Sequence, residues 1–263
     1  MRRTMARRTA VAVSALSLTL LVGGCGADKA EDGAAAGDKG KDSGSAAKAL
    51  SAAELDKIVL AAKDLKAEHR VTKASKVDLV AGKRASTDKA ECKPFVDVLA
   101  FRPMGTPGAT AQRKLVPVPA KPAKDASPEE KMKAAMDVFK GAITSDTVGS
   151  YDGKGAEEAF AALRAAGEAC AGGFVLSDGS DLANKDNTKF TKVAPGPAYT
   201  GGDEALTFNL SFDMEGETGT ETGNHQVVAV RKGNALAAFG VLGLTGKAEF
   251  PKAIIDAQVA KLG

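Results

Sequence analysis

The segment from Ala205 to Leu244 most constrains the fold, because it holds three strand patterns in succession. In ALTFNLSFDM, apolar and polar side chains alternate without interruption, as expected for a strand that buries one face. The apolar positions of this pattern are Leu206, Phe208, Leu210, Phe212 and Met214. QVVAVRK is apolar on both faces, which is typical of a central strand, and Gly233-Asn234 predicts a tight turn into ALAAFGVLGL. The three patterns predict an antiparallel sheet.

Helical patterns come before and after these strands. LSAAELDKIVLAAKDL begins with Ser51 and Glu54 at the spacing of a capping box and predicts a helix that runs to Leu65. Further helices are predicted around residues 92–100, from Ser127, over 155–170, and from Pro251 to the C-terminus. RKLVPV, AITSDTVGSY and GFVLSDG predict additional strands. Because helices do not alternate regularly with strands, we predict an α+β fold, an antiparallel sheet packed by helices.

The first 24 residues have the pattern of an export signal. MRRTMARR is basic, the following run from Ala10 to Val22 is apolar, and Gly23 and Gly24 are small. The apolar run is too short for a stable membrane span. LVGGC resembles the bacterial lipobox, which implies that Cys25 is acylated, with palmitate-type chains, after the preceding peptide is removed. The alternative is a plain secretory signal followed by a chance cysteine.

A tether and one domain are predicted to follow the signal. Residues 25–50 consist of the cysteine and then almost entirely of Gly, Ala, Ser, Asp and Lys, which cannot form a core. A flexible segment of this length spans roughly 25–30 Å on average. Two or three acyl chains on Cys25 would give stable anchoring, since stable anchoring takes two. We therefore predict a signal peptide (1–24), a lipidated tether (25–50) and a single exported α+β domain (51–263) on the outer face of the cell membrane.

The charge balance argues against a nucleic-acid partner. The whole chain has a formal net charge of +3, but Arg2, Arg3, Arg7 and Arg8 lie in the predicted signal. Without them, 32 basic groups face 33 acidic groups, a net charge of −1. A nucleic-acid-binding domain needs a basic face, which this composition does not indicate.

Cys92 and Cys170 are the two cysteines of the predicted domain. An even pair in an exported domain predicts a disulfide bond between them. Such a bond would close a loop of about 79 residues and contribute roughly 4–5 kcal/mol in the chain-entropy model. The alternative is two separate buried thiols.

Motifs for catalysis, metal binding or a cofactor are not found. The chain has two histidines, His69 and His225, and neither belongs to a ligand-spaced cluster. GKGAEE resembles the start of a phosphate loop, but its glutamates would repel phosphate at the following helix start. DGSDLANKDN lacks EF-hand spacing, and MEGETGTETGNH (214–225) is interpreted as an exposed acidic loop. We predict no cofactor, no metal site and no enzymatic activity.

Several segments together resemble one known family. They are LSAAEL…KDL, ECKPFVDVL, VGSYDGKGAEEAFAALRAAGEACAGGF, GDEAL, VVAVRKGNALAAF and FPKAIIDAQVAKL. In this order they resemble actinobacterial exported lipoproteins whose domain is similar to the extracellular sensor domain of a mycobacterial Ser/Thr kinase, called PknH-like. The resemblance covers roughly residues 50–263. It implies an antiparallel sheet packed by helices, and a cleft for an unknown ligand. That kinase pattern usually carries two disulfides, whereas this chain has cysteines for one.

Two functions of different classes remain open from the sequence. The first is a sensor-like domain that binds a small or lipidic ligand through apolar contacts, with Phe208, Leu210, Phe212 and Phe239 as candidate binding residues. The second is an envelope protein that interacts with another protein and has no small ligand. In both cases the membrane is a partner through the lipid anchor. The Leu206–Met214 stripe also fits an ordinary core face.

Overall fold

A nine-stranded antiparallel sheet organises the residues that the computed structural model describes, which are 47–66, 69–118, 121–137, 141–179, 187–216, 219–243 and 245–263. All of them belong to the compact unit Gly44–Gly263. The strand order is β1-β3-β4-β9-β8-β7-β6-β5-β2. The strands are β1 (His69–Lys73), β2 (Ser86–Thr87), β3 (Ala109–Pro117), β4 (Ala142–Ser150), β5 (Phe174–Ser177), β6 (Thr188–Pro195), β7 (Glu204–Gly216), β8 (Gly219–Lys232) and β9 (Ala235–Gly243). The fold is α+β, as predicted.

The three predicted C-terminal strands form the centre of this sheet. β8 lies between β7 and β9 and is buried on both faces over Val227–Val230, which confirms it as a central strand. Gly233 makes the β8–β9 turn with a φ of +57°, a value that glycine adopts without a Cβ penalty. The prediction of a loop over 214–225 was wrong. β7 continues to Gly216 and β8 begins at Gly219, and these two glycines form the last pair of the hairpin. Backbone hydrogen bonds extend the two strands here, so the pairing does not require apolar side chains.

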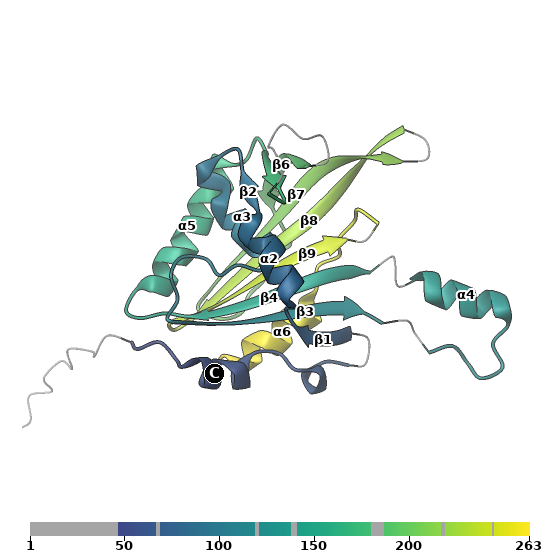
Figure 1. Ribbon diagram of the computed structural model, residues 1–263, viewed down its shortest axis with the longest axis horizontal. Helices are drawn as coiled ribbons and strands as arrows, with labels where there is room; N and C mark the ends of the chain where they lie inside the picture. The colour runs from purple at the N-terminus through teal and green to yellow at the C-terminus, as the bar shows by residue number, and fades with distance from the viewer. Residues whose placement is uncertain are drawn as a thin grey trace, which may run out of the picture. The chain divides into compact units, whose positions relative to one another are not determined.

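Helices cover both faces of the sheet (Figure 1). Those of the described residues are α1 (Ala52–Ile58), α2 (Lys76–Arg84), α3 (Lys93–Leu99), α4 (Pro128–Asp137), α5 (Gly155–Ala169) and α6 (Lys252–Lys261), with 3₁₀ turns η1 (Ala62–Asp64) and η2 (Ala90–Cys92). α3 and α5 pack on one face, here called the α3–α5 face, and α1 and α6 pack on the other, the α1–α6 face. No helix in the described ranges has both the length and the apolar character needed to cross a membrane.

The core of the α3–α5 face is rich in aromatic rings. Phe95 of α3 lies edge-on to Phe208 of β7, with ring centres 5.1 Å apart, and Phe174 lies 4.9 Å from Phe190. Edge-to-face contacts of this kind add to the energy of apolar burial. α5 approaches the sheet closely at Gly167, where an added Cβ would come within 2.4 Å of the Phe208 ring. Glycine at this position lets the helix pack against the ring.

The core of the α1–α6 face is mainly aliphatic and includes several polar groups. Leu55 of α1 and Ile255 of α6 are fully buried against β3, β4, β8 and β9. Gln258 of α6 is also fully buried; its Oε1 accepts from the Leu60 N–H and its Nε2 donates to the Ile58 carbonyl, both at 2.9 Å. This side chain satisfies backbone groups of the irregular segment between α1 and η1.

The structure corrects several predicted boundaries. The Ser51–Glu54 capping box is present, but α1 ends at Ile58 and a 3₁₀ turn follows, so the helix to Leu65 was wrong. The Ser127 cap and the helices over 93–99 and 155–169 agree with the prediction. α6 begins at Lys252, with Pro251 as its N-cap.

Candidate functional site

Cys25, the predicted lipidation site, and the predicted signal peptide lie outside the described residues. Lipidation at Cys25 and the division at residues 24 and 50 therefore stay predictions. The first described residues are nevertheless informative. Ala47, Lys48, Ala49 and Leu50 are bound to the body of the domain: the Gly153 N–H donates to the Ala47 carbonyl at 2.8 Å, and the Ala49 N–H donates to the Asp152 carboxylate at 2.8 Å. The chain thus enters the domain beside the β4–α5 turn.

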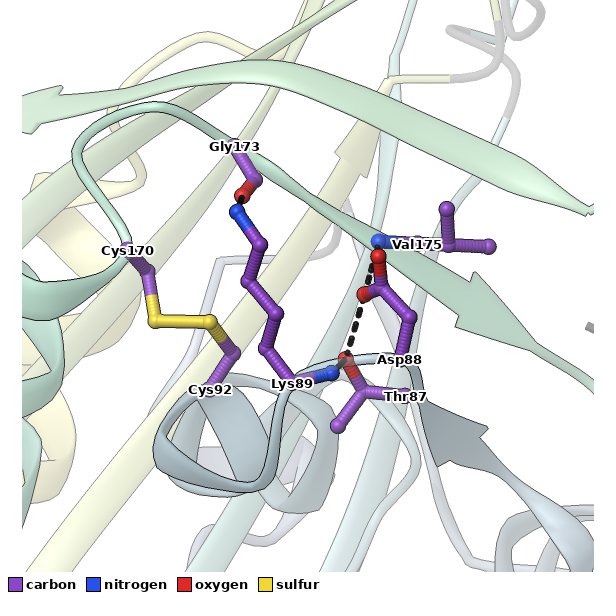
Figure 2. The surroundings of a disulfide bond; sticks show 7 residues. All are labelled: Thr87, Asp88, Lys89, Cys92, Cys170, Gly173 and Val175. Carbon is purple, nitrogen blue, oxygen red and sulfur yellow. Dashed lines mark hydrogen bonds between the residues drawn. A yellow bond between two sulfur atoms is a disulfide. The ribbon is translucent and has the colours of Figure 1, made fainter.

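The predicted disulfide between Cys92 and Cys170 is confirmed. Both cysteines are fully buried, and the bond joins the turn η2 to the end of α5. Figure 2 shows two further links beside it. The Lys89 ammonium donates to the Gly173 carbonyl at 2.5 Å, and the Val175 N–H donates to Asp88 at 2.7 Å. Together with the β2–β5 pairing, these bonds fasten the segment after α2 to β5.

The four candidate apolar binding residues are not brought together. Phe208, Leu210 and Phe212 contact the core of the α3–α5 face, and Leu210 is fully buried there. Phe239 is fully buried in the core of the α1–α6 face. Its placement with the other three was wrong, because β8 separates β7 from β9 and Phe239 pairs with Val228, which faces the α1–α6 side. Whether any of the four residues contacts a ligand stays a prediction.

A cleft of about 300 Å³ lies between α2, the end of α3, and β5 with the start of β6. We call it the α2–β5 cleft. Its lining residues are Asp78, Ala81, Gly82, Ala85, Leu99, Ala100, Phe101, Leu176, Ser177, Asp178, Asn187 and Thr188. Small and apolar side chains make up most of the wall, and acidic and amide groups lie among them. Such a surface provides apolar contact area with a few polar groups, which is the usual composition of a small-molecule site.

Close packing of α2 against the end of α3 defines one wall of this cleft. A Cβ added at Gly82 would come within 2.1 Å of the Ala100 carbonyl oxygen, so only glycine fits there. The next residue, Phe101, has a φ of +57°, an uncommon value for a residue other than glycine. Backbone strain of this kind costs of order 1–3 kcal/mol and persists where the surroundings impose it.

Arg102 and Gln112 hold this strained residue in place. Arg102 Nη1 donates to the carbonyls of Gly82 and Ala85, at 3.2 and 2.9 Å, and Nη2 pairs with the buried carboxylate of Asp97 at 2.7 Å. Gln112 Nε2 donates to the Phe101 carbonyl at 2.5 Å. The arginine therefore connects the C-terminal end of α2 to α3 and fixes the width of the α2–β5 cleft.

The acidic group on α2 is engaged at the edge of this cleft. Asp78 completes a capping box with Ser75 and pairs with the Lys114 ammonium at 2.9 Å. Burial opposes ionisation of Asp78, but the hydrogen bonds from Lys114 and Ser75 outweigh it and hold its pKa below the ordinary value. Asp78 is therefore a charged, structural group at neutral pH. The described lining includes no histidine, cysteine or lysine.

Asp146 is the most unusual ionisable group outside the cleft. It lies on β4 on the α1–α6 face, is fully buried, and neither carboxyl oxygen has a hydrogen-bond partner among the described residues. It pairs in register with Arg113 of β3, whose Nη2 instead binds Asp56 at 2.6 Å. Burial raises the pKa of Asp146 to about 8, against the opposing effect of Arg113. This group is therefore mainly protonated at neutral pH.

His225 is half-buried on the α3–α5 face, next to two aromatic rings. Its ring centre lies 4.7 Å from that of Phe212 and 5.9 Å from that of Phe190. Burial lowers its pKa to about 4, although a backbone hydrogen bond to Asn224, which favours the charged imidazole, acts in the opposite direction. The imidazole is neutral at physiological pH and belongs to the core. His69, the other histidine, begins strand β1.

No group of three or more His, Cys, Asp or Glu residues within the described ranges could hold a metal ion. Helix α2, which provides most of one wall of the α2–β5 cleft, was not predicted from the sequence pattern. A signal for it exists in the sequence: Ser75 and Asp78 have the spacing of a capping box. The exposed Val77 and Val80 obscured the helix, because they do not form a core-facing stripe with its other apolar residues.

Comparisons with known proteins show a distant likeness to a solved structure. No family model and no curated protein matches the chain. Among solved structures, the chain is similar to the extracellular domain of PknH from Mycobacterium tuberculosis, at 13% identity and a TM-score of 0.43. The match covers 82% of this chain and 95% of that one. A likeness of this size carries no conclusion about what this chain binds.

Proposed function

We propose that this chain is an exported domain, anchored to the outer face of the cell membrane through acylated Cys25, that binds a small apolar or lipidic ligand in the α2–β5 cleft. The observation that carries the proposal is the cleft itself, about 300 Å³ in volume and lined largely by small and apolar side chains. A ligand that buries about 200 Å² of apolar surface would gain roughly 5 kcal/mol from this contact before the costs of association.

The chain before α1 is attached to the domain by several hydrogen bonds. Besides the contacts of Ala47 and Ala49, the Leu50 N–H donates to Ser150 Oγ at 2.9 Å, and Asn234 Nδ2 donates to the Lys48 carbonyl at 2.9 Å. In this proposal the predicted tether, residues 25–50, links the acylated cysteine to the domain. A tether of this length and composition spans roughly 25 Å on average.

Filling the α2–β5 cleft tests ligand binding directly. Ala81→Phe places a ring in the cleft from α2, and Ala165→Phe makes the same change at an exposed position of α5. The probe is N-phenyl-1-naphthylamine, whose fluorescence rises in an apolar site. We expect saturable binding to the unchanged chain and to Ala165→Phe, and at least about tenfold weaker binding to Ala81→Phe. Equal binding to all three proteins would contradict the proposal.

A natural ligand would be sought in protein purified from its own envelope, by native mass spectrometry followed by lipid extraction. A stoichiometric ligand that is absent from Ala81→Phe would support the proposal.

The lipid anchor has a separate test. Cys25→Ser is expected to release the protein to the medium or to leave an uncleaved precursor, because no thiol remains for acylation. Membrane fractionation and the mass of the mature N-terminus provide the measurement. A variant that fractionates like the unchanged protein would show that Cys25 is not the anchor.

A second candidate function, an envelope protein-interaction module, is favoured by one observation. Val77 and Val80 of α2 are 78% and 57% exposed, although valine is usually buried. If no ligand is recovered and Ala81→Phe behaves like its control, we expect Val77→Asp with Val80→Asp to abolish a specific cross-link to an envelope protein. Cross-linking that is unchanged in this double variant would exclude α2 as the contact.

A further inference from the structure

A second cavity, of about 410 Å³, lies on the α1–α6 face, where the first turn of α6 meets the ends of β1, β3, β4 and β9. We call it the α6 cavity. Its lining residues are His69, Pro117, Gly141, Ala142, Thr144, Val241, Glu249, Phe250, Pro251, Lys252, Ala253 and Ile254. It shares no residue with the α2–β5 cleft. The wall is mainly apolar, so its few polar groups determine what chemistry it would recognise.

Thr144 is the buried polar side chain on this wall. It lies on β4 opposite Val241 of β9, lines the cavity and is only 1% exposed, and none of the side-chain hydrogen bonds of the described residues involves its hydroxyl. A hydroxyl on a cavity wall takes its hydrogen-bond partner from protein, water or ligand. The cavity is therefore where this hydroxyl would find its partner.

A backbone donor lies on the same wall. The N-cap of α6, Pro251, has no side chain that caps the helix. The N–H groups of Ile254 and Ile255 both donate to the Pro251 carbonyl, whereas that of Ala253 has no acceptor among the described residues. The first turn of a helix carries partial positive charge and stabilises anions. A free N–H and a free hydroxyl on one cavity wall both suit a ligand atom that accepts hydrogen bonds.

The charged groups around the α6 cavity do not oppose a ligand atom that accepts hydrogen bonds. The Lys252 ammonium is already paired with Asp256 at 2.6 Å and lies 5.9 Å from the centre of the Tyr199 ring. Glu249 is exposed at the rim, where water screens its carboxylate. His69 is half-buried at the end of β1 and offers a further polar group.

We propose that the α6 cavity binds a small molecule that carries a carboxylate on an apolar body. The carboxylate accepts hydrogen bonds from the Thr144 hydroxyl and the Ala253 N–H. The apolar body lies against Pro117, Val241 and Phe250. This site is separate from the proposed function of the α2–β5 cleft and does not depend on it.

The test uses decanoate as the probe and decylamine, with the same chain and a cationic head, as its counterpart. Binding is measured by calorimetry, and the site is located by amide shifts of the ¹⁵N-labelled domain. We expect saturable binding of decanoate with its largest shifts at Ala253 and its neighbours, and binding of decylamine that is at least about tenfold weaker. Equal affinity for the two probes, or no saturable binding of decanoate, would overturn the proposal.

Thr144→Val removes the hydroxyl and keeps the shape of the side chain. We expect it to weaken decanoate binding about tenfold or more, since hydrogen bonds to charged groups are among the stronger ones. The matched control is Thr147→Val on the same strand, because Thr147 is 2% exposed and faces the α3–α5 side. Equal effects of the two substitutions would overturn the proposal.

Two further variants locate the site without removing a buried group. Ala253→Leu, at an exposed helical position, should narrow the α6 cavity and reduce decanoate binding. Ala165→Phe, at an exposed position of α5 that lines neither the cleft nor the α6 cavity, should leave decanoate binding unchanged. If only Ala81→Phe, in the α2–β5 cleft, reduced decanoate binding, the acid would bind in the cleft and the α6 cavity would not be a carboxylate site.

Discussion

The two faces of the sheet are stabilised by different kinds of interaction. On the α3–α5 face, stacked and edge-on phenylalanine rings surround a disulfide bond, and the half-buried His225 is neutral. On the α1–α6 face, aliphatic side chains surround the buried polar groups Arg113, Asp146, Thr144 and Gln258. The first face depends on packing and a covalent bond, whereas the second encloses polar groups, of which Gln258 and Arg113 are hydrogen-bonded and Asp146 is not. Changes in redox state should therefore affect the first face, and changes in pH the second.

The largest expected effect concerns the disulfide. Replacing both Cys92 and Cys170 by alanine should lower the free energy of unfolding by about 4–5 kcal/mol, because the bond joins residues that are 78 positions apart. Urea denaturation provides the measurement, and reduction of the unchanged protein provides a second route to the same state. If the comparison of the faces holds, hydrogen exchange should accelerate first in β5 and β2. A loss below about 1 kcal/mol would show that packing alone holds the α3–α5 face.

The next effect is a pH dependence that arises from Asp146. Its pKa is about 8 in the folded protein, against 3.8 for an ordinary aspartate, so the folded state binds the proton more tightly than the unfolded state does. The stabilising contribution is complete below about pH 4 and is lost as pH rises toward 8, at up to about 1.4 kcal/mol per unit. Asp146→Asn removes this titration. From pH 5 to pH 7 the free energy of unfolding of the unchanged protein should fall by up to about 2.7 kcal/mol more than that of Asp146→Asn.

The control for this prediction is Asp213→Asn, at an exposed position of β7. It should keep the pH dependence of the unchanged protein, because Asp146 is still present. Free energies of unfolding from urea titrations at pH 5, 6 and 7 provide the comparison. Parallel pH profiles for Asp146→Asn and the unchanged protein would show that Asp146 is ionised in the folded state.

A smaller effect is expected at Gln258. Gln258→Leu keeps the volume but leaves the Leu60 N–H and the Ile58 carbonyl without their partner, which should cost about 2 kcal/mol. Gln226→Leu, on the same face, is the matched control. It loses one bond, to the Ala248 carbonyl, and also removes a buried Oε1 that has no partner among the described residues, so its cost should be lower. Equal losses of unfolding free energy in the two variants would show that the number of hydrogen bonds lost does not determine the cost on this face.

The sequence predicted where several strands lie in the chain better than it predicted on which face of the sheet their side chains lie. Alternation identified β7, and the two-sided apolar pattern identified β8 as central. The sequence pattern could not show on which face of the sheet Phe239 lies, because β9 is buried on both faces. The orientation of β9 follows only from its register with β8. β6 was missed because a register shift between Phe190 and Lys192 interrupts its alternation, so that its buried positions, Phe190 and Val193, are three residues apart.

The candidate site was less predictable than the fold. The disulfide followed from the count of cysteines and the predicted compartment. The α2–β5 cleft did not, because it depends on a glycine contact, a strained Phe101 and an arginine bridge between helices. None of these has a periodic signal in the sequence. The α6 cavity likewise arises where α6 leaves part of the sheet uncovered, which is a property of packing.

The smallest expected effect compares two helix caps, one for each face. Ser51 caps α1 on the α1–α6 face, and Ser75 caps α2 beside the α2–β5 cleft; each hydroxyl accepts from a backbone N–H, of Glu54 at 3.3 Å and of Asp78 at 3.1 Å. Ser51→Ala and Ser75→Ala should each lower the free energy of unfolding by about 1 kcal/mol. Only Ser75→Ala should also weaken N-phenyl-1-naphthylamine binding, because Asp78, which lines the cleft, loses one of the bonds that orient it. Equal probe binding by the two variants would show that the first turn of α2 does not shape the cleft.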